Sequence, residues 1–292
     1  MTSMAKEMRP AQLNAKRRRR WSAYSVFQYG ILIVLSLIAL IPFLTLLMVS
    51  FKTHSDFMKY PLRLPHTLSL QNYVTVFQRS SIVRSFMNSF IITAGSLVIE
   101  LFVGTLASYA ITKMTFKRAG FYSAFFLIPM IFPVQTITIP VYIIYKNLGL
   151  LNTYGGMMIL YAAIGIPMVV FMMTSFMKTI PYQISESAMI DGATHFVIYS
   201  RLILPLMQPV VSTLIVICGL TAWNDFYLPQ IMLTRTELKT LPLKIYDFFG
   251  QYTSDWTLIC TCIVYVIVPI IILYCFLQRN IIDGITAGAV KG

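Results

Sequence analysis

Charged side chains are scarce in this chain of 292 residues, where they make up 11% of the composition; an ordinary soluble domain carries about 25%. The few charges also avoid six long apolar runs, in which Glu100 and Asp225 are the only charged residues. Each run exceeds the roughly 20 residues that a helix needs to cross a bilayer. The sequence therefore excludes a soluble globule and a coiled coil, and it predicts an all-α polytopic membrane protein with six transmembrane helices. The predicted spans are 27–50, 86–111, 120–145, 156–177, 207–230 and 257–278.

Residues that bind metals or form disulfides are also few. The four cysteines all lie inside apolar runs, and the three histidines (His54, His66 and His195) are far apart in the sequence. We interpret the cysteines as small packing residues and expect neither a disulfide scaffold nor a metal site. The chain contains no H-E-x-x-H or G-x-S-x-G motif. We therefore expect a transport protein with no catalytic residues and no cofactor of its own.

The net charge of +13 raises the possibility of nucleic-acid binding, because Lys16 is followed by four arginines. This basic run lies just before the first predicted span, where positive residues set the orientation of a membrane protein. We interpret it as a topological signal rather than a nucleic-acid site. With six crossings, both termini are then cytoplasmic, and the cytoplasmic segments carry 14 Lys and Arg against 9 outside.

The order of polar and apolar segments predicts four regions. A cytoplasmic basic tail is followed by the first span with a long external loop, then by a core of five spans, and last by a short tail. This glycine-containing tail is interpreted either as a disordered end or as a contact with a partner. The regions cover 1–26, 27–85, 86–277 and 278–292.

Proline interrupts several predicted spans, and a proline removes a backbone hydrogen bond where no water can replace it. The third run holds Pro129, Pro133 and Pro140, so we expect it to line a protein-facing or wet cavity. In the long external segment, 51–85, Pro61 and Pro65 accompany aromatic residues, which predicts a partly folded loop.

The segment 178–206, between the fourth and fifth spans, is the most informative part of the sequence. Pro181 suits the first turn of a helix, and Ile184 and Ala188 then share one face. Gly192 is expected to end this helix, and Thr194 to cap a second short helix that Pro205 terminates. Two short apolar helices outside the membrane need a partner to bury their surface.

These residues resemble a family. The pattern Glu-Ala-Ala, three residues, Gly, nine residues, Ile-x-Leu-Pro is similar to the signature loop of binding-protein-dependent ABC importer permeases. This chain has Glu186, Ser187 and Ala188, then Gly192, and ends with Leu204 and Pro205. It departs from the pattern at Ser187 and at Leu202. The resemblance extends to Asn88-Ser89, Trp223 to Phe226 and the tail from Gly284 to Gly292. Together these residues look like the carbohydrate-uptake branch of the family, which is exemplified by the second permease of the maltose-type importer.

The resemblance implies a type I ABC importer permease architecture with six transmembrane helices, located in the bacterial cytoplasmic membrane. It implies that a second permease subunit shares the pore. It also implies two further kinds of partner, namely two copies of a cytoplasmic ATPase and one extracellular or periplasmic solute-binding protein. No Gly-Lys dipeptide occurs in the chain, so a Walker A motif is absent and ATP and Mg are expected on the separate ATPase. The residues expected to couple the permease to that ATPase are Glu186, Ser187, Ala188, Asp191, Gly192, Leu204 and Pro205.

Candidates for the substrate path are polar and aromatic residues within the spans. Glu100 either contacts solute or is hydrogen-bonded inside the bundle, because a carboxylate at this depth must be paired or wet. Asn224 and Asp225 either line the external vestibule or cap a helix end. Trp223, Phe226 and Tyr227 are expected on one helical face, as an interfacial aromatic belt rather than a surface for sugar rings. Gln135 is a further candidate for lining the pore.

The function predicted is alternating-access import of a sugar or oligosaccharide, driven by ATP, with lipid and solute as the small-molecule partners and no nucleic acid. A permease for another small polar solute, such as a glycerol phosphate, is the first alternative. An ion-coupled secondary transporter is the second, but such carriers commonly have several intramembrane charges and internal repeats, and this chain has neither.

Overall fold

The computed structural model describes residues 23–79, 81–114, 117–249 and 254–289. The chain divides into two compact units, Met1–Thr45 and Leu46–Gly292, which are described separately. In the first unit, helix α1 (Ala23–Ser50) begins and runs past Pro42 without a charged residue. The basic run at Lys16 lies outside the described residues, as do residues 1–22 of the predicted tail 1–26.

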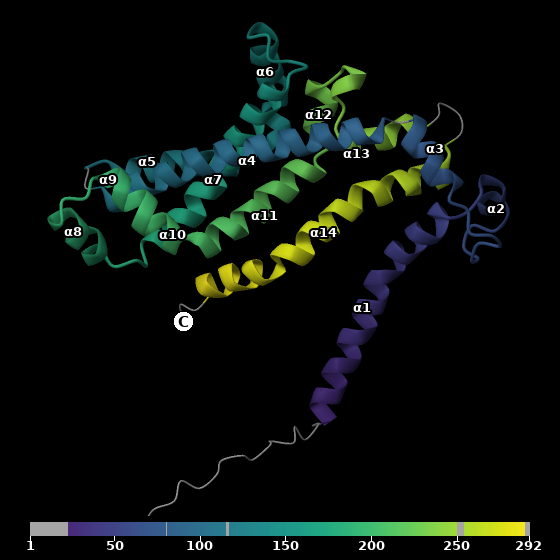
Figure 1. Ribbon diagram of the computed structural model, residues 1–292, viewed down its shortest axis with the longest axis horizontal. Helices are drawn as coiled ribbons and strands as arrows, with labels where there is room; N and C mark the ends of the chain where they lie inside the picture. Colours follow the sequence, from purple (N-terminus) through teal and green to yellow (C-terminus); the bar gives the residue numbers. More distant parts are fainter. Residues whose placement is uncertain (1–22, 80, 115–116, 250–253, 290–292) are drawn as a thin grey trace, which may run out of the picture. The chain divides into compact units, whose positions relative to one another are not determined.

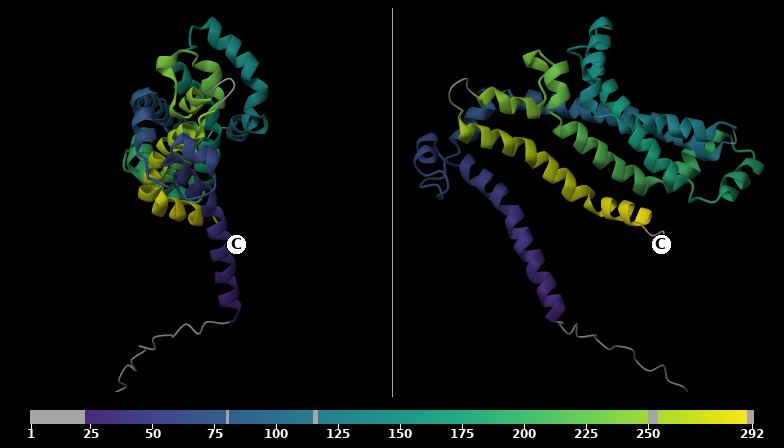
Figure 2. Two further views of the ribbon diagram at one scale, coloured as in Figure 1. Left: turned by 90° about the vertical axis from the view of Figure 1, so that its right-hand side faces the viewer. Right: turned by 180° about the vertical axis from the view of Figure 1, so that it is seen from behind.

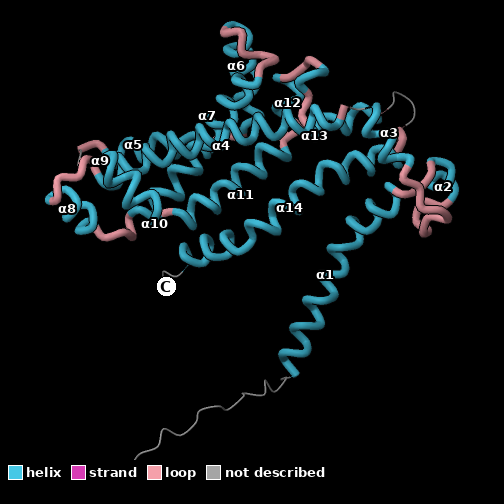
Figure 3. Tube along the Cα trace, in the orientation of Figure 1, coloured by secondary structure: helices cyan, strands magenta, loops and turns pink. Residues whose placement is uncertain are grey.

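Helices make up the second unit, and the described ranges contain no strand beyond one isolated bridge between Phe249 and Ser254. Figure 3 shows that helices joined by loops make up the described part of the trace. The α-helices after α1 are α2 (His54–Lys59), α3 (Gln71–Arg79), α4 (Ile82–Lys113), α5 (Ala119–Leu127), α6 (Val134–Asn147), α7 (Tyr154–Met177), α8 (Tyr182–Ile190), α9 (His195–Val197), α10 (Leu204–Leu206), α11 (Gln208–Asn224), α12 (Tyr227–Met232), α13 (Leu241–Lys244) and α14 (Trp256–Ala289).

Three of the described helices are apolar and long enough to cross a membrane as single elements: Phe27–Ser50 in α1, α4 and α7. Two further pairs reach that length only as bent spans, namely Ala119–Ile131 with α6, bent by 100°, and His195–Leu206 with α11, bent by 76°. The last apolar stretch, Trp256–Ile272, is shorter. The membrane-protein fold class is confirmed, whereas the count of six spans stays a prediction.

The third predicted span, 120–145, is therefore not one straight helix. Phe132 is extended (ψ 127°), as expected for a residue before proline, and α6 starts only after Pro133. Pro129 lies at the start of the 3-10 turn Ile128–Ile131, and Pro140 stays inside α6. The run bends at these prolines, and its role in lining a cavity stays a prediction.

Helices α4 and α7 pack side by side through small residues. A Cβ on Gly104 would overlap Val169, and a Cβ on Gly165 would overlap the carboxylate of Glu100. Helix α11 lies between α4 and α14 (Figures 1 and 2). Helix α14 continues through Ala289, so the backbone of the predicted tail 278–292 is helical up to that residue rather than irregular.

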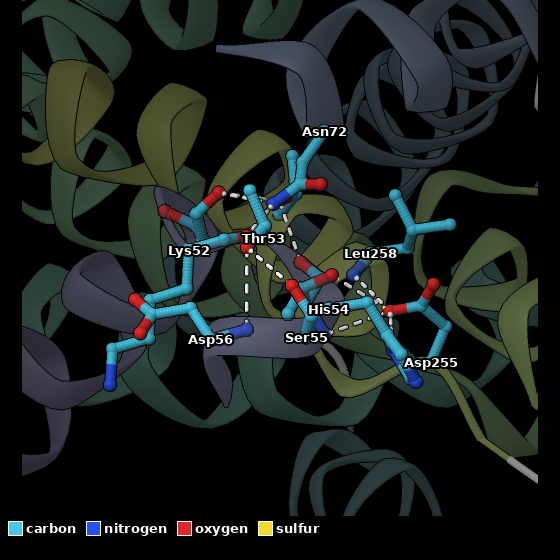
Figure 4. Close-up of polar contacts among 11 residues, drawn as sticks. Lys52, Thr53, His54, Ser55, Asp56, Asn72, Asp255 and Leu258 are labelled. Carbon is cyan, nitrogen blue, oxygen red and sulfur yellow. Dashed lines mark hydrogen bonds and ion pairs between the residues drawn. The ribbon is translucent and has the colours of Figure 1, made fainter. Parts of the chain in front are cut away.

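The segment after α1 is folded, as the sequence predicts. Lys52 is fully buried, and its ammonium donates hydrogen bonds to the carbonyls of Tyr60 (2.6 Å) and Pro61 (3.1 Å). The amide of Asn72 donates to the carbonyls of Ser50 and Lys52, at 2.9 and 2.7 Å (Figure 4). These bonds to backbone oxygens fix the turn that leads out of α1.

Candidate functional site

Helix α8 is the first part of the 178–206 segment, and local rules determine both of its ends. Pro181 has an extended ψ of 137°, so the helix begins at Tyr182. At the other end Gly192 has φ +84°, a left-handed conformation that favours glycine. The amides of Gly192 and Ala193 donate back to the carbonyls of Met189 (3.0 Å) and Ala188 (2.9 Å). The predicted termination at Gly192 is confirmed.

The buried face of α8 differs from the predicted one. Ser185 is 1% exposed, and Ala188 and Met189 pack against the core formed with α7 and α11, so the buried positions follow i, i+3, i+4. Ile184 and Ile190 are instead exposed. The prediction that Ile184 and Ala188 share one face that needs a partner holds only for Ile184, because the permease's own core takes Ala188 inward.

The outward side of α8 carries Glu186, Ser187 and Ile190, all exposed, and Asp191 is exposed just beyond the helix. Ile190 has 81% of its surface exposed. Neither carboxylate has an ion-pair or hydrogen-bond partner within the described part of the chain. The resulting surface combines an apolar patch with two free anions.

Thr194 caps the next helix as predicted, since its hydroxyl accepts a hydrogen bond from the Val197 amide at 3.5 Å. The helix then continues to Leu206 through a π-helical turn at Ile198–Ile203. Pro205 lies inside this stretch, and the 76° bend comes at Met207. The prediction that Pro205 ends the helix is wrong. The π turn widens the backbone just before Pro205, which accommodates a residue without an amide hydrogen. Leu204 packs into the core, whereas Pro205 is exposed.

Three residues at the end of α4 hold the 178–206 segment, and none of them was predicted from the sequence. The Lys113 ammonium donates to the Ile180 carbonyl at 2.7 Å. The hydroxyl of Tyr109 is hydrogen-bonded to Nδ1 of His195 at 3.2 Å, and that of Thr105 to the hydroxyl of Tyr199 at 2.7 Å. Their spacing at i, i+4, i+8 places them on one helix face and was a usable signal.

Glu100 lies inside the bundle. It is 2% exposed, its carboxylate lies near the thiol of Cys218 on α11, and it lies directly against Gly165 on α7. Its second oxygen, Oε2, has no hydrogen-bond partner among the described residues. Glu100 was expected either to contact solute or to lie inside the bundle. The structure of this chain shows the second position, since only 2% of the residue is exposed.

Asp225 stabilises a break in the fifth predicted span. Helix α11 ends at Asn224, and Asp225 is extended before α12 begins. The carboxylate accepts hydrogen bonds from the Tyr161 hydroxyl and the Tyr227 amide, both at 2.9 Å. Asp225 thus caps a helix start, while Asn224 and Tyr227 are exposed.

The break also separates the three aromatic residues that were expected on one helix face. Trp223 packs edge-on against Phe86 of α4, with ring centroids 5.6 Å apart. Phe226 stacks on Tyr246, with centroids 4.4 Å apart and planes 12° from parallel. The prediction of a shared face is wrong, because it assumed one continuous helix. Gln135 is exposed near the start of α6.

A cavity of about 510 Å³ lies among α4, α11 and α14, and of the predicted substrate-path residues only Trp223 lines it. Thr93 is the other lining residue with a polar side-chain atom, and the rest of the lining is apolar or glycine. A sugar needs more hydrogen-bonding groups than this cavity offers. This cavity therefore does not gather the substrate-path candidates.

Asn88 and Ser89, part of the sequence resemblance, hold the segment before α13. The Asn88 amide donates to the carbonyls of Glu237 (2.8 Å) and Lys239 (3.0 Å), and its oxygen accepts from the Tyr154 hydroxyl at 2.7 Å. The Ser89 hydroxyl accepts from the Leu241 amide at 2.8 Å. This end of α4 is thus bound to residues about 150 positions later in the chain.

Residues 100–285 match the family described as the binding-protein-dependent transport system inner membrane component. This chain belongs to that family. The match covers the whole 178–206 segment and most of the helices packed around it. The family identified from the Glu186 to Pro205 pattern is confirmed, and the chain is a transport component of the inner membrane rather than an enzyme.

Curated relatives extend the similarity over nearly the whole chain. The chain is 35% identical over 259 residues to the probable starch degradation products transport system permease protein AmyC of Thermoanaerobacterium thermosulfurigenes, covering 89% of this chain and 94% of that protein. It is 33% identical to the multiple sugar-binding transport system permease protein MsmG of Streptococcus mutans, covering 91% and 96%.

A solved structure has the same fold. A chain of a bacterial ABC transporter involved in the import of the acidic polysaccharide alginate matches with a TM-score of 0.78 at 22% identity, covering 89% of this chain and 97% of that one. The fold expected from the resemblance, that of an ABC importer permease, is confirmed.

Proposed function

We propose that this family member is one half of a two-permease pore in an ATP-driven saccharide importer. Two cytoplasmic ATPase chains supply the energy, and a solute-binding protein outside the membrane delivers the solute. The single observation that carries the proposal is α8: its inner side is packed into the permease core, while its outer side presents Glu186 and Ile190 without partners in the described chain. A docking element for another protein requires both properties.

The orientation follows from this assignment. The 178–206 segment faces the cytoplasm, where the ATPases are, and the α12 to α13 region faces outside. Both termini are then cytoplasmic, in agreement with the basic run near the N-terminus and the positive-inside rule.

The saccharide class rests on the relatives, whose names specify starch degradation products and multiple sugars. Among the described residues, neither the apolar cavity nor the buried Glu100 offers the hydrogen-bonding groups of a sugar site. We therefore place most of the solute contacts at the interface with the second permease. Each half of such a pore contributes one wall of the path.

The mechanism begins when the ATPases close on ATP. Glu186 and Asp191 provide anions for basic groups of the ATPase, and exposed Ile190 and Ser187 provide the contact surface between them. Ala188 and Leu204 transmit the displacement because they pack into the core, and Gly192 fixes the turn between the two helices. The movement rocks α7 and α11 against the partner permease and changes the side from which the path is open.

The experiment that tests the proposal is ATP hydrolysis by the assembly reconstituted from the subunits encoded beside this chain. A panel of maltose, maltotriose, sucrose, raffinose and glycerol 3-phosphate is added with the binding protein. Saccharides are expected to stimulate hydrolysis and transport. Stimulation by glycerol 3-phosphate alone would contradict the saccharide class.

The matched variants are Glu186→Lys on α8 and Glu237→Lys, an exposed carboxylate at the other end of the fold. Glu186→Lys is expected to insert normally but to lose ATPase binding or saccharide stimulation, because it reverses a charge at the docking surface. Glu237→Lys should keep ATPase binding. Full stimulation in Glu186→Lys would contradict the docking role of α8.

A further inference from the structure

The last three turns of α4 bind the 178–206 segment at three positions, and two of these lie on either side of α8. Lys113 contacts Ile180, just before α8, and Tyr109 contacts His195, just after the Gly192 turn. Thr105 contacts Tyr199, one helical turn further on. Thr105, Tyr109 and Lys113 are 3–4% exposed, so these contacts are shielded from solvent. We call these three residues the α4 anchor.

The Lys113 contact has a specific physical reason. The Ile180 carbonyl lies beyond the end of α7 and directly before Pro181, which has no amide hydrogen and lies outside α8. No helix uses this carbonyl, and a cation is favoured at the carboxyl end of a helix such as α7. Lys113 satisfies both requirements from a different helix. Its ammonium is buried, so loss of this carbonyl would leave the charge poorly compensated.

The Tyr109 contact joins the second helix of the segment to the same helix face. Its ring lies edge-on to Tyr199, with centroids 5.5 Å apart, in addition to the hydrogen bond with His195. Tyr199 is 5% exposed and in turn bonds to Thr105. The segment is thus held on both sides of α8 by one rigid helix, while the outward side of α8 stays free.

We propose that Tyr109 and Lys113 are positioning residues for energy coupling: they hold the 178–206 segment rigidly on α4, so that displacement of α8 moves α4 instead of deforming the loop. This proposal rests on the proposed function, in which α8 is the element that the ATPases move. Without the anchor, α8 would still bind an ATPase, but the 178–206 segment would deform when the ATPase displaces α8.

The test uses the reconstituted assembly carrying Lys113→Met, Tyr109→Phe, or both. Measurements are the amount of ATPase that co-purifies, the basal rate of ATP hydrolysis, its stimulation, and the solute transported per ATP. The saccharide used is the one that stimulates the wild-type assembly most. We expect normal co-purification and basal hydrolysis in all three proteins. Lys113→Met should lose about tenfold in stimulation and in solute per ATP, because a lost hydrogen bond from a charged group shifts an equilibrium by at least that factor. Tyr109→Phe should lose less, because its hydrogen bond is between uncharged groups.

Matched controls are Lys146→Met and Tyr142→Phe on α6, which remove an exposed ammonium and a hydroxyl without a hydrogen-bond partner in the described chain. Lys113→Arg should restore most of the solute transported per ATP, since it keeps a cationic donor. A purely structural role predicts instead that less assembled protein is recovered and that its transport per ATP is unchanged, and this result would overturn the proposal.

The outcomes separate this proposal from the proposed function. If wild-type protein binds no ATPase and shows no saccharide stimulation, the proposed function fails. If the wild type is stimulated and both anchor variants match it in solute per ATP, only the role of the anchor is refuted.

Discussion

The contact between Gly165 and Glu100 predicts that Gly165→Ala destabilises the protein when Glu100 is present and stabilises it when Glu100 is replaced by alanine. Glycine at position 165 lets the carboxylate of Glu100 lie against the backbone of α7. A Cβ at this position would lie 2.9 Å from Oε1 and closer still to Cδ and Oε2. Real Cβ atoms do not tolerate such distances, so Gly165→Ala must displace a buried carboxylate from its place between α4, α7 and α11.

The magnitude follows from two opposing effects. Overpacking a well-packed core costs about 1–3 kcal/mol, and replacing a helical glycine by alanine returns up to about 1 kcal/mol. Gly165→Ala alone is therefore expected to destabilise the protein by up to about 2 kcal/mol. In the Glu100→Ala background the carboxylate is absent and the new methyl group fills part of the space it leaves. There Gly165→Ala should stabilise, which gives an interaction free energy of about 1–3 kcal/mol in a double-mutant cycle.

The assay is thermal unfolding of the detergent-purified chain, followed by loss of the monodisperse peak in size-exclusion chromatography. At about 2–4 °C per kcal/mol, the destabilised variant should melt several degrees lower than wild type. Gly155→Ala near the start of α7 is the control, because no atom lies within 4 Å of a Cβ placed there. If Gly165→Ala shifts the melting temperature equally in both backgrounds, the assigned contact with Glu100 is wrong.

Two further predictions concern the segment between α12 and α14. Asn88→Leu removes both hydrogen bonds to the carbonyls of Glu237 and Lys239, so trypsin should cleave after Lys239 about tenfold faster. The control Asn147→Leu on α6 should not change the cleavage rate. Equal cleavage rates in Asn88→Leu and wild type would contradict the role of Asn88. Burial disfavours the charge on Asp247, but hydrogen bonds from Lys239 (2.8 Å) and Lys244 (3.0 Å) outweigh it and hold the pKa of that carboxyl below its ordinary value. A lowered folded-state pKa stabilises the protein fully above the unfolded-state pKa, and this stabilisation is lost as the pH falls through the folded-state pKa. Melting temperature measured from pH 7 to pH 3 should therefore fall less in Asp247→Asn than in wild type, and parallel curves would refute the ion pairs.

The sequence allowed correct prediction of features that depend on a few neighbouring residues. Gly192 ends α8 because only glycine readily adopts φ +84°, and Thr194 caps the next helix because its hydroxyl reaches the Val197 amide. The family could be identified for the same reason, since its signature lies in consecutive residues. Composition alone was enough for the membrane-protein class.

Features that depend on distant contacts could not be predicted from the sequence. Which side of α8 is buried depends on the core below it, so Ala188 turned inward while Ile184 did not. Asp225 breaks a span because Tyr161, on another helix, completes its hydrogen bonds. Lys113 carries no local signal for its role, because its partner Ile180 lies 67 positions later.

The two bonded ends of α4 give the importer proposal its mechanical basis. Asn88 holds the segment before α13, Lys113 holds the start of the 178–206 segment, and the two residues are 25 positions apart. At 1.5 Å per residue this is a continuous helix of about 37 Å, comparable to the thickness of a membrane. An α-helix keeps its length under load because its hydrogen bonds are internal, whereas the loops at either end can deform. In the proposed orientation, displacement of α8 by an ATPase would reach the outer segment through α4 itself, provided that the α4 anchor holds.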